Sequence, residues 1–531
     1  MKKTFIYNLA FNLLCGLILS CAANNRLYAA DKKVWITLGD AAYTELQHLT
    51  PNTLLKDSRI IETGSLGFAS QEKIHLVQMN QTDIHALSGA IHIKLKRCGG
   101  YMEHASEAQG RAALDVAANG FTAAPSVMGL APSYTIDNQT TVTPLLAQMQ
   151  APNIGQTIVD LSNIVNRYYT TAGGVSGSNW IKNKWQQLAN GRSYVTVEQF
   201  THAGWPQKSV IMTVQGSDNA GEVIVLGAHI DSINHAGTSE TTRAPGADDD
   251  ASGIASLTET VRVLMESNYR PRRTIKFMAY AAEEVGLKGS AEIAKKYKTD
   301  GIKVVGVMQL DMTNYKGSTQ DIYIYTDYAD SAQNTFLANL ITTYQPGVTI
   351  GYNACGYACS DHASWYGQGF TTSYPDETVD GEDNPNMHTA GDTYAFMGSQ
   401  ANKSLKFARL ATSYAVELGS DGPALPPPTT ALSNGVPISI PSLPLNTTKT
   451  FSLLVPSGKT TLNIKLSGGS GDGDLFAKFG STPSTTVYDA KSDGSTNAET
   501  ITIKAPKAGT YFVLVKAYAA VSNASIVATF Q

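Results

Sequence analysis

The chain has 531 residues, more than a single domain usually contains, so we expect two or three domains of which one is large. Hydrophobic residues make up 42% of the chain and charged residues 16%, which is typical of a globular protein and excludes a largely disordered one. The formal net charge of -4 argues against a nucleic-acid partner, because phosphate backbones attract strongly basic surfaces.

The first 30 residues are typical of a signal peptide. Two lysines precede an apolar run from Phe5 to Leu19, and small residues near Ala29 and Ala30 offer a cleavage site. The run is shorter than the about 20 residues that cross a bilayer. We therefore predict a secreted, extracellular protein with no stable membrane association. A retained membrane anchor and a lipoprotein modified at Cys21 are the alternatives.

Cysteine usage agrees with export. Cys15 and Cys21 would leave with the signal, so the exported chain keeps Cys98, Cys355 and Cys359, an odd number that leaves one unpaired. Cys355 and Cys359 are close enough along the chain to form a small-loop disulfide in an oxidising compartment, which would leave Cys98 alone. A zinc-binding thiol pair is the alternative, although no further cysteine is available to complete such a site.

The middle of the chain has the pattern of an α/β domain. Residues 31–135 mix short strand-like and helical runs and indicate a small α+β region. Residues 150–420 alternate buried strands with amphipathic helices, which predicts a mostly parallel central sheet flanked by helices. The clearest strands are Val223–Leu226, Thr274–Tyr280 and Val304–Leu310.

The composition changes near residue 420. Residues 421–435 begin with a proline-rich stretch and read as a semi-rigid linker. Beyond it, apolar residues alternate with polar ones, as at Leu462, Ile464 and Leu466, between turns rich in Gly and Ser. This pattern predicts a C-terminal β-sandwich over residues 436–531.

Each of the three clear strands runs into residues that can bind a metal. His229 and Asp231 follow the first strand, Glu283 and Glu284 follow the second, and Asp311 follows the third. Because ligands of an open parallel sheet gather at the carboxyl ends of its strands, we expect these side chains to meet.

Two loops add to this cluster. Asp249 lies in the loop Gly246–Gly253, which opens the helix after the first strand, and His388 lies in a long C-terminal loop. A single acid beside a strand is more often a helix cap or a solvated loop residue. Two imidazoles with several carboxylates, however, suit two zinc ions that share a bridging carboxylate.

These motifs resemble those of the M28 family of zinc aminopeptidases, in particular its secreted bacterial leucyl aminopeptidases. The resemblance covers roughly residues 150–415, and the order and spacing of the motifs agree throughout. The motifs are Gly227–Ser232, Gly246–Gly253, Ala282–Gly286, Gln309–Met312, Ser360–His362 and Met387–Thr389.

The resemblance implies a metallo-aminopeptidase with two Zn²⁺ that hydrolyses peptides or proteins with free N-termini. It makes Asp249 the carboxylate that bridges both ions, with His229 and Asp311 completing one site and Glu284 and His388 completing the other.

The remaining catalytic roles follow from the same resemblance. Glu283 would be the general base toward a zinc-activated water, and then the general acid toward the leaving amine. Asp231 would hold the free imidazole nitrogen of His229. Tyr357 looks like the phenol that contacts the reacting centre, with ordinary packing as its alternative role.

The flanking regions also gain expectations from the family. Residues 31–135 look like an N-terminal propeptide that assists folding or covers the active site until it is removed. Residues 436–531 look like a pre-peptidase C-terminal domain. Accessory packing or substrate attachment is the alternative for both.

One loop departs from the leucine-preferring relatives. Asp376, Asp380 and Asp383 stand where apolar residues of the side-chain pocket are expected. A carboxylate in a narrow pocket favours a Lys or Arg side chain, because an unpaired buried charge is costly. We therefore hypothesise a preference for basic N-terminal residues. The alternatives are a solvated or calcium-binding loop with a leucine or aromatic pocket elsewhere.

Other functions remain as rivals. A related metal carboxypeptidase or a glutaminyl cyclase would use a similar sheet and ligand cluster, but both predicted zinc sites are intact here. A non-catalytic surface-binding protein with a degenerate peptidase domain is the alternative from another class, and the presence of Glu283 argues against it.

Overall fold

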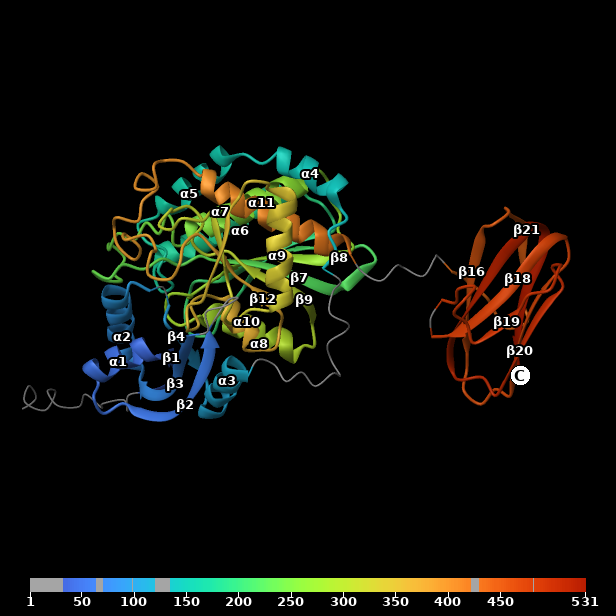
Figure 1. The fold of residues 1–531 in the computed structure, drawn as a ribbon, viewed down its shortest axis with the longest axis horizontal. Coiled ribbons are helices and arrows are strands. Elements are labelled where there is room, and N and C mark those ends of the chain that lie inside the picture. Colours follow the sequence, from blue (N-terminus) through green and yellow to red (C-terminus); the bar gives the residue numbers. More distant parts are fainter. Residues whose placement is uncertain (1–31, 64–69, 98, 120–133, 422–428, 481) are drawn as a thin grey trace, which may run out of the picture. The chain divides into compact units, whose positions relative to one another are not determined.

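The computed structural model describes residues 32–63, 70–97, 99–119, 134–421, 429–480 and 482–531. The predicted signal peptide and Cys98 lie outside these residues. The chain divides into two compact units, residues 1–422 and 423–531, and each is described by itself (Figure 1). Among the described residues, no helix has the length and apolar character that crossing a membrane requires.

The first unit is built around a mixed sheet with the strand order β12-β9-β7-β8-β6-β5. The strands are β5 (Val195–Phe200), β6 (Ser209–Val214), β7 (Asn219–His229), β8 (Arg273–Tyr280), β9 (Lys303–Gln309) and β12 (Thr372–Ser373). Strands β12, β9, β7 and β8 run parallel, while β6 and β5 are antiparallel to their neighbours. The mostly parallel sheet is thus confirmed, and the three predicted strands coincide with β7, β8 and β9.

Both faces of this sheet are buried, which explains the continuous apolar runs of its strands. The helices are α6 (Ala172–Ala189), α7 (Ala251–Glu266), α8 (Lys288–Thr299), α10 (His362–Tyr366) and α11 (Asn402–Ser420). On β7, Ile224 and Leu226 pack in one core with α6, α7 and α11, whereas Val223 and Val225 pack in a second core with α8 and α10 (Figure 1). Each such side chain contributes about 1.5–3 kcal/mol when fully buried.

The remaining elements of this domain pack on the same framework. They are α4 (Gln139–Ala147), α5 (Ala151–Ser162), α9 (Ser331–Tyr344) and a small sheet of β10 (Ile322–Tyr325), β11 (Ile350–Asn353) and β13 (Pro375–Asp376). Val142 and Leu145 of α4 belong to the main core. The packed domain therefore begins before residue 150. The hydrophobic pattern of the sequence places its start at residue 150.

The N-terminal region is a small α+β fold, as predicted. Its antiparallel sheet has the order β2-β3-β1-β4, and a short core covers one face. The elements are β1 (Lys33–Gly39), α1 (Asp40–Leu49), β2 (Leu54–Thr63), β3 (Ser70–Asn80), α2 (Ile84–Ala90), a π-helical turn (Ile91–Leu95), β4 (Tyr101–His104) and α3 (Glu107–Asn119). This region belongs to the same compact unit as the central sheet.

The second unit is all β, as predicted. Its strands are β14 (Thr430–Ala431), β15 (Ile438–Leu443), β16 (Thr448–Val455), β17 (Thr461–Ser467), β18 (Ser470–Phe479), β19 (Ala490–Ser492), β20 (Glu499–Lys504) and β21 (Gly509–Phe530). The long β21 pairs with β16 and β18 through its first half and with β15 and β17 through its second half. Strand β14 already pairs with β16, so the ordered fold begins inside the predicted linker 421–435.

The first unit is expected to fold without the second, because among the described residues each unit encloses a hydrophobic core built from its own side chains. A chain truncated after Asp421 should unfold cooperatively within a few degrees of the first unit in the full chain, as measured by differential scanning calorimetry. Truncation after Leu410 serves as the control, because it removes half of α11 and the buried Tyr414. An unfolded or aggregated Asp421 truncation would contradict this independence.

Candidate active site

The carboxyl ends of β7, β8 and β9 bring the predicted ligands together. His229 ends β7, and its Nε2 atom lies 2.9 Å from Asp249 Oδ1 and 3.3 Å from Asp311 Oδ1. His388 Nε2 lies 2.7 Å from Asp249 Oδ2 and 3.0 Å from Glu284 Oε2. The two oxygens of Asp249 therefore face different imidazoles, which is the position that a bridging carboxylate requires.

Burial and mutual repulsion shape the charges of this cluster. Burial, with the neighbouring Asp249 carboxylate, raises the pKa of Glu284 to about 7. Burial alone would lower the pKa of His388, but the Glu284 and Asp249 carboxylates raise it to about 10. Burial, with Asp311 and Glu284, also raises the pKa of Glu283 well above its ordinary value. So many carboxylates at one buried point need a compensating positive charge.

The residues present fit metal ions. Glu284 Oε1 is buried and makes no hydrogen bond within the described part of the chain, while Glu284 Oε2 and Asp311 Oδ1 are buried and face the imidazoles of the other predicted ligands. His229, Asp249 and Glu284 have ligand atoms within 4.8 Å of one another, as do His229, Asp250 and Asp311. Nitrogen and carboxylate donors of this kind suit zinc.

Asp250, although adjacent to Asp249, already has another structural task. Its Oδ1 atom accepts hydrogen bonds from the Gly253 and Met312 backbone N–H groups, and its Oδ2 atom accepts one from the His229 backbone N–H. It therefore caps helix α7 and ties the ends of β7 and β9 together. Asp249, which faces both imidazoles, is the better candidate ligand.

Asp231 organises the site through backbone contacts. Its two carboxylate oxygens accept hydrogen bonds from the backbone N–H groups of Glu283, at 3.0 Å, and of Glu284, at 3.2 Å. His229 Nδ1 lies 3.1 Å from the backbone carbonyl oxygen of Asp231 and 3.5 Å from its carboxylate. Asp231 thus orients the predicted base and one predicted ligand, while its backbone carbonyl is the nearer partner of the imidazole.

Two supporting residues gave no signal in the sequence. Arg167 is fully buried and donates hydrogen bonds to the backbone carbonyls of Ile230, at 2.7 Å, and Gly246, at 2.8 Å. Asp392 accepts hydrogen bonds from the backbone N–H groups of Asp248 and Asp249. Both hold the loop that carries Asp249, and both lie far from it in the chain.

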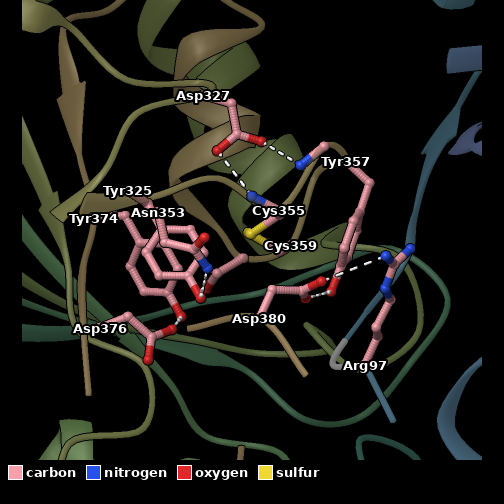
Figure 2. The surroundings of a disulfide bond; sticks show 12 residues. Arg97, Tyr325, Asp327, Asn353, Cys355, Tyr357, Cys359, Tyr374, Asp376 and Asp380 are labelled. Atoms are coloured by element: carbon pink, nitrogen blue, oxygen red, sulfur yellow. Dashed lines mark hydrogen bonds and ion pairs between the residues drawn. A yellow bond between two sulfur atoms is a disulfide. The ribbon is translucent and has the colours of Figure 1, made fainter. Parts of the chain in front are cut away.

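A disulfide joins Cys355 to Cys359 and closes a small loop beside the site, as predicted from the cysteine spacing (Figure 2). Asp327 accepts hydrogen bonds from the backbone N–H groups of Cys355 and Gly356 and anchors this loop. The next residue, Ser360, donates a 2.6 Å hydrogen bond from Oγ to Asp311 Oδ2. The disulfide loop is therefore connected directly to a predicted metal ligand.

The three loop aspartates have different surroundings. Asp376 is 3% exposed and accepts hydrogen bonds from the Tyr374 hydroxyl, at 2.5 Å, and the Thr378 backbone. Asp383 accepts a hydrogen bond from the Thr378 hydroxyl, and burial raises the pKa of its carboxyl to about 7. Both carboxylates therefore form hydrogen bonds inside their own loop and stabilise its conformation.

Asp380 instead faces the disulfide loop. Its Oδ1 atom accepts a 3.1 Å hydrogen bond from the Tyr357 hydroxyl, and its Oδ2 atom lies 3.4 Å from Arg97 of the N-terminal region (Figure 2). Of the three acids, Asp380 alone is seen in contact with a cation among the described residues.

The N-terminal region supplies residues to the site that sequence reasoning missed. The His92 ring packs against the His388 ring with centroids 4.0 Å apart, and His92, Glu284 and His388 form a further group with metal-binding geometry. The local pattern of residues 31–135 contains no catalytic cluster, because His92 and Arg97 reach the site only through the folding of distant segments.

Comparison with known proteins agrees with this geometry. Residues 209–413 match peptidase family M28, and residues 447–517 match the bacterial pre-peptidase C-terminal domain. Leucine aminopeptidase 1 of Coccidioides posadasii is 35% identical over 299 residues, which cover 53% of this chain and 75% of that protein. The chain belongs to peptidase family M28.

Solved structures lead to the same family. LapB and the LapA aminopeptidase, both of Legionella pneumophila, match with TM-scores of 0.58 and 0.60 at 29% and 27% identity. The matches cover 73% and 74% of this chain and 100% of each solved chain. The M28 protein is a metallo-aminopeptidase, and the predicted family and enzyme class are confirmed.

Replacing Asp231 with Asn should weaken metal binding by about 10- to 100-fold, because the residue orients His229 and the Glu283–Glu284 backbone. Competition with a chromogenic chelator measures this affinity without requiring turnover. Asp160→Asn, a partly exposed carboxylate on α5, is the matched control and should leave the affinity unchanged. Equal affinities of both variants would contradict the orienting role.

Proposed function

We propose that this M28 protein is a dinuclear zinc aminopeptidase that removes one residue at a time from the free amino end of peptides. The observation that carries the proposal is the Asp249 carboxylate, whose two oxygens face His229 and His388. His229 and Asp311 would hold one ion with Asp249, and Glu284 and His388 the other. Zinc bound there would polarise the scissile carbonyl and make water a stronger nucleophile at neutral pH.

Glu283 is the proposed proton carrier. Its side chain is fully buried beside the predicted ligands, and its backbone N–H is fixed by Asp231. Burial and neighbouring carboxylates raise the pKa of Glu283 above the ordinary value of a glutamate, which makes this side chain a stronger proton acceptor than a solvated glutamate. Glu283 would take a proton from the attacking water and deliver it to the leaving amine.

Glu283→Gln should lower kcat by about 10²- to 10⁴-fold while leaving the zinc content at two ions per chain, because the side chain carries a proton and binds no metal. The measurement is hydrolysis of aminoacyl p-nitroanilides by protein whose N-terminal region has been removed, together with elemental analysis. Chelation should abolish the activity, and zinc should restore it. Glu266→Gln, an exposed residue of α7, is the control. Full activity of Glu283→Gln would refute the assignment.

We further propose a preference for Lys or Arg as the first residue of the substrate. The support is that Asp380 and Tyr357 already accommodate a guanidinium, that of Arg97, which lies 3.4 Å from Asp380 Oδ2 and 4.7 Å from the Tyr357 ring centroid. The contact involves the disulfide loop. Ser360, which directly follows this loop, donates a hydrogen bond to Asp311. A pocket for leucine or aromatic side chains with the same mechanism is the second candidate, which the names of the curated relatives favour.

Asp380→Asn should reduce kcat/KM for Lys and Arg p-nitroanilides by about tenfold or more, because a substrate cation would lose its partly buried partner. Hydrolysis of the Leu and Phe substrates should change little. Glu382→Gln, an exposed position on the same loop, is the matched control. If unaltered enzyme prefers Leu or Phe and Asp380→Asn affects all four substrates equally, the basic preference is wrong.

We also propose that residues 1–30 direct export, that residues 31–135 are a removable propeptide, and that the C-terminal unit is an accessory domain of the secreted enzyme. The support for the propeptide is that His92 and Arg97 lie against residues of the proposed site. The support for export is the signal-like sequence and the pre-peptidase C-terminal match.

A further inference from the structure

Three described residues of the N-terminal region, His92, Arg97 and Gly99, lie against groups of the proposed site. His92 packs on His388, and a Cβ atom added at Gly99 would lie only 3.4 Å from Glu283 Oε1 and 3.6 Å from the Cys359 carbonyl oxygen. Gly99 has a φ of 56°, in the left-handed region that favours glycine. The backbone at Gly99 therefore passes close to the proposed base with no side chain of its own.

Arg97 lies between these two contacts. Its guanidinium is paired with Asp380 and stacked over the Tyr357 ring, and the side chains of Arg97 and Asp380 are each only 19% exposed (Figure 2). His92 Nδ1 donates a 2.7 Å hydrogen bond to the Arg97 carbonyl oxygen, which fixes the backbone at this point. A cation held by both a carboxylate and an aromatic face occupies a specific pocket rather than a general acidic surface.

The rest of the N-terminal region supports this placement. Glu103 forms a 3.0 Å ion pair with Lys288, just after the Glu283–Glu284 pair. A Cβ atom added at Gly356 of the disulfide loop would lie 2.9 Å from the Glu72 side chain, so this side chain packs directly on the Gly356 backbone. The residues that make these contacts, Glu72 and Glu103, stand before and after Arg97 in the chain.

We propose that Arg97 is an internal mimic of a substrate's basic first side chain, and that it fills the cation pocket of Asp380 and Tyr357 until the N-terminal region leaves. The inference rests on the proposed basic preference. Arg97 is joined to Lys96 by a peptide bond and has no free amino group, so an aminopeptidase binds it without cleaving it. The pocket of Asp380 and Tyr357 would thus bind both Arg97 and the first side chain of a substrate through their positive charge.

The test uses the full chain with a site-specific protease sequence inserted between Asn119 and Tyr134. After cutting, the N-terminal region stays bound only through its contacts, and sedimentation over a dilution series gives its dissociation constant. Arg97→Met should raise this constant by about tenfold or more, since it removes the ion pair and the cation–aromatic contact. Arg97→Lys should stay within a few-fold of the unaltered chain. Lys33→Met, at an exposed site on β1, is the matched control for loss of a positive charge.

Competition by small amides tests the mimicry itself. In the cut Glu283→Gln chain, which should not hydrolyse the amides, argininamide should displace the N-terminal region at concentrations at least about tenfold lower than leucinamide does, and adding Asp380→Asn should remove this difference. Equal displacement by both amides, or Arg97→Met and Lys33→Met dissociating alike, would overturn the proposal. Measuring these constants requires no turnover. If the released enzyme had no peptidase activity, the proposed function would be contradicted. The role of Arg97 would still be tested by the dissociation and displacement constants.

Discussion

The meeting of several carboxylates and two imidazoles in a water-poor pocket is the constraint on which the rest of the structure depends. Charges of one sign repel strongly at low dielectric, so such a cluster survives only when each member has a partner. The fold divides the acids into two groups. Asp231, Asp250 and Asp392 accept backbone N–H groups and hold the loops, whereas Glu284 and Asp311 keep oxygens available for a cation. The scaffold acids thereby fix the geometry of the proposed ligands.

The disulfide loop connects this centre to the proposed side-chain pocket. On one side, Ser360 is bonded to Asp311, and on the other, Tyr357 is bonded to Asp380. A displacement of the loop would therefore alter both metal binding and side-chain recognition. Arg97 of the N-terminal region contacts Tyr357 in the same loop. The N-terminal region and a substrate side chain would therefore use the same surface.

Much of the fold followed from local patterns. Continuous apolar runs located β7, β8 and β9, because a strand buried on both faces cannot alternate with polar residues. Boundaries were less accurate. Helix α4 joins the main core before the predicted start at 150, and β14 begins within the predicted linker, because these short elements are stabilised by distant partners rather than by their own sequence. The family and enzyme class were predictable because the M28 motifs are numerous and their order and spacing in this chain agree with the family.

The sequence by itself determined which residues stand at the strand ends, since His229, Glu284 and Asp311 each follow an apolar run and parallel strands end at one edge. Only the tertiary structure distinguished Asp380 from Asp376 and Asp383, because all three are acids in one loop and their hydrogen-bond partners come from other segments. It also decided that Arg97 faces Asp380. Contacts between segments almost three hundred residues apart depend on how domains pack, and no local pattern encodes that.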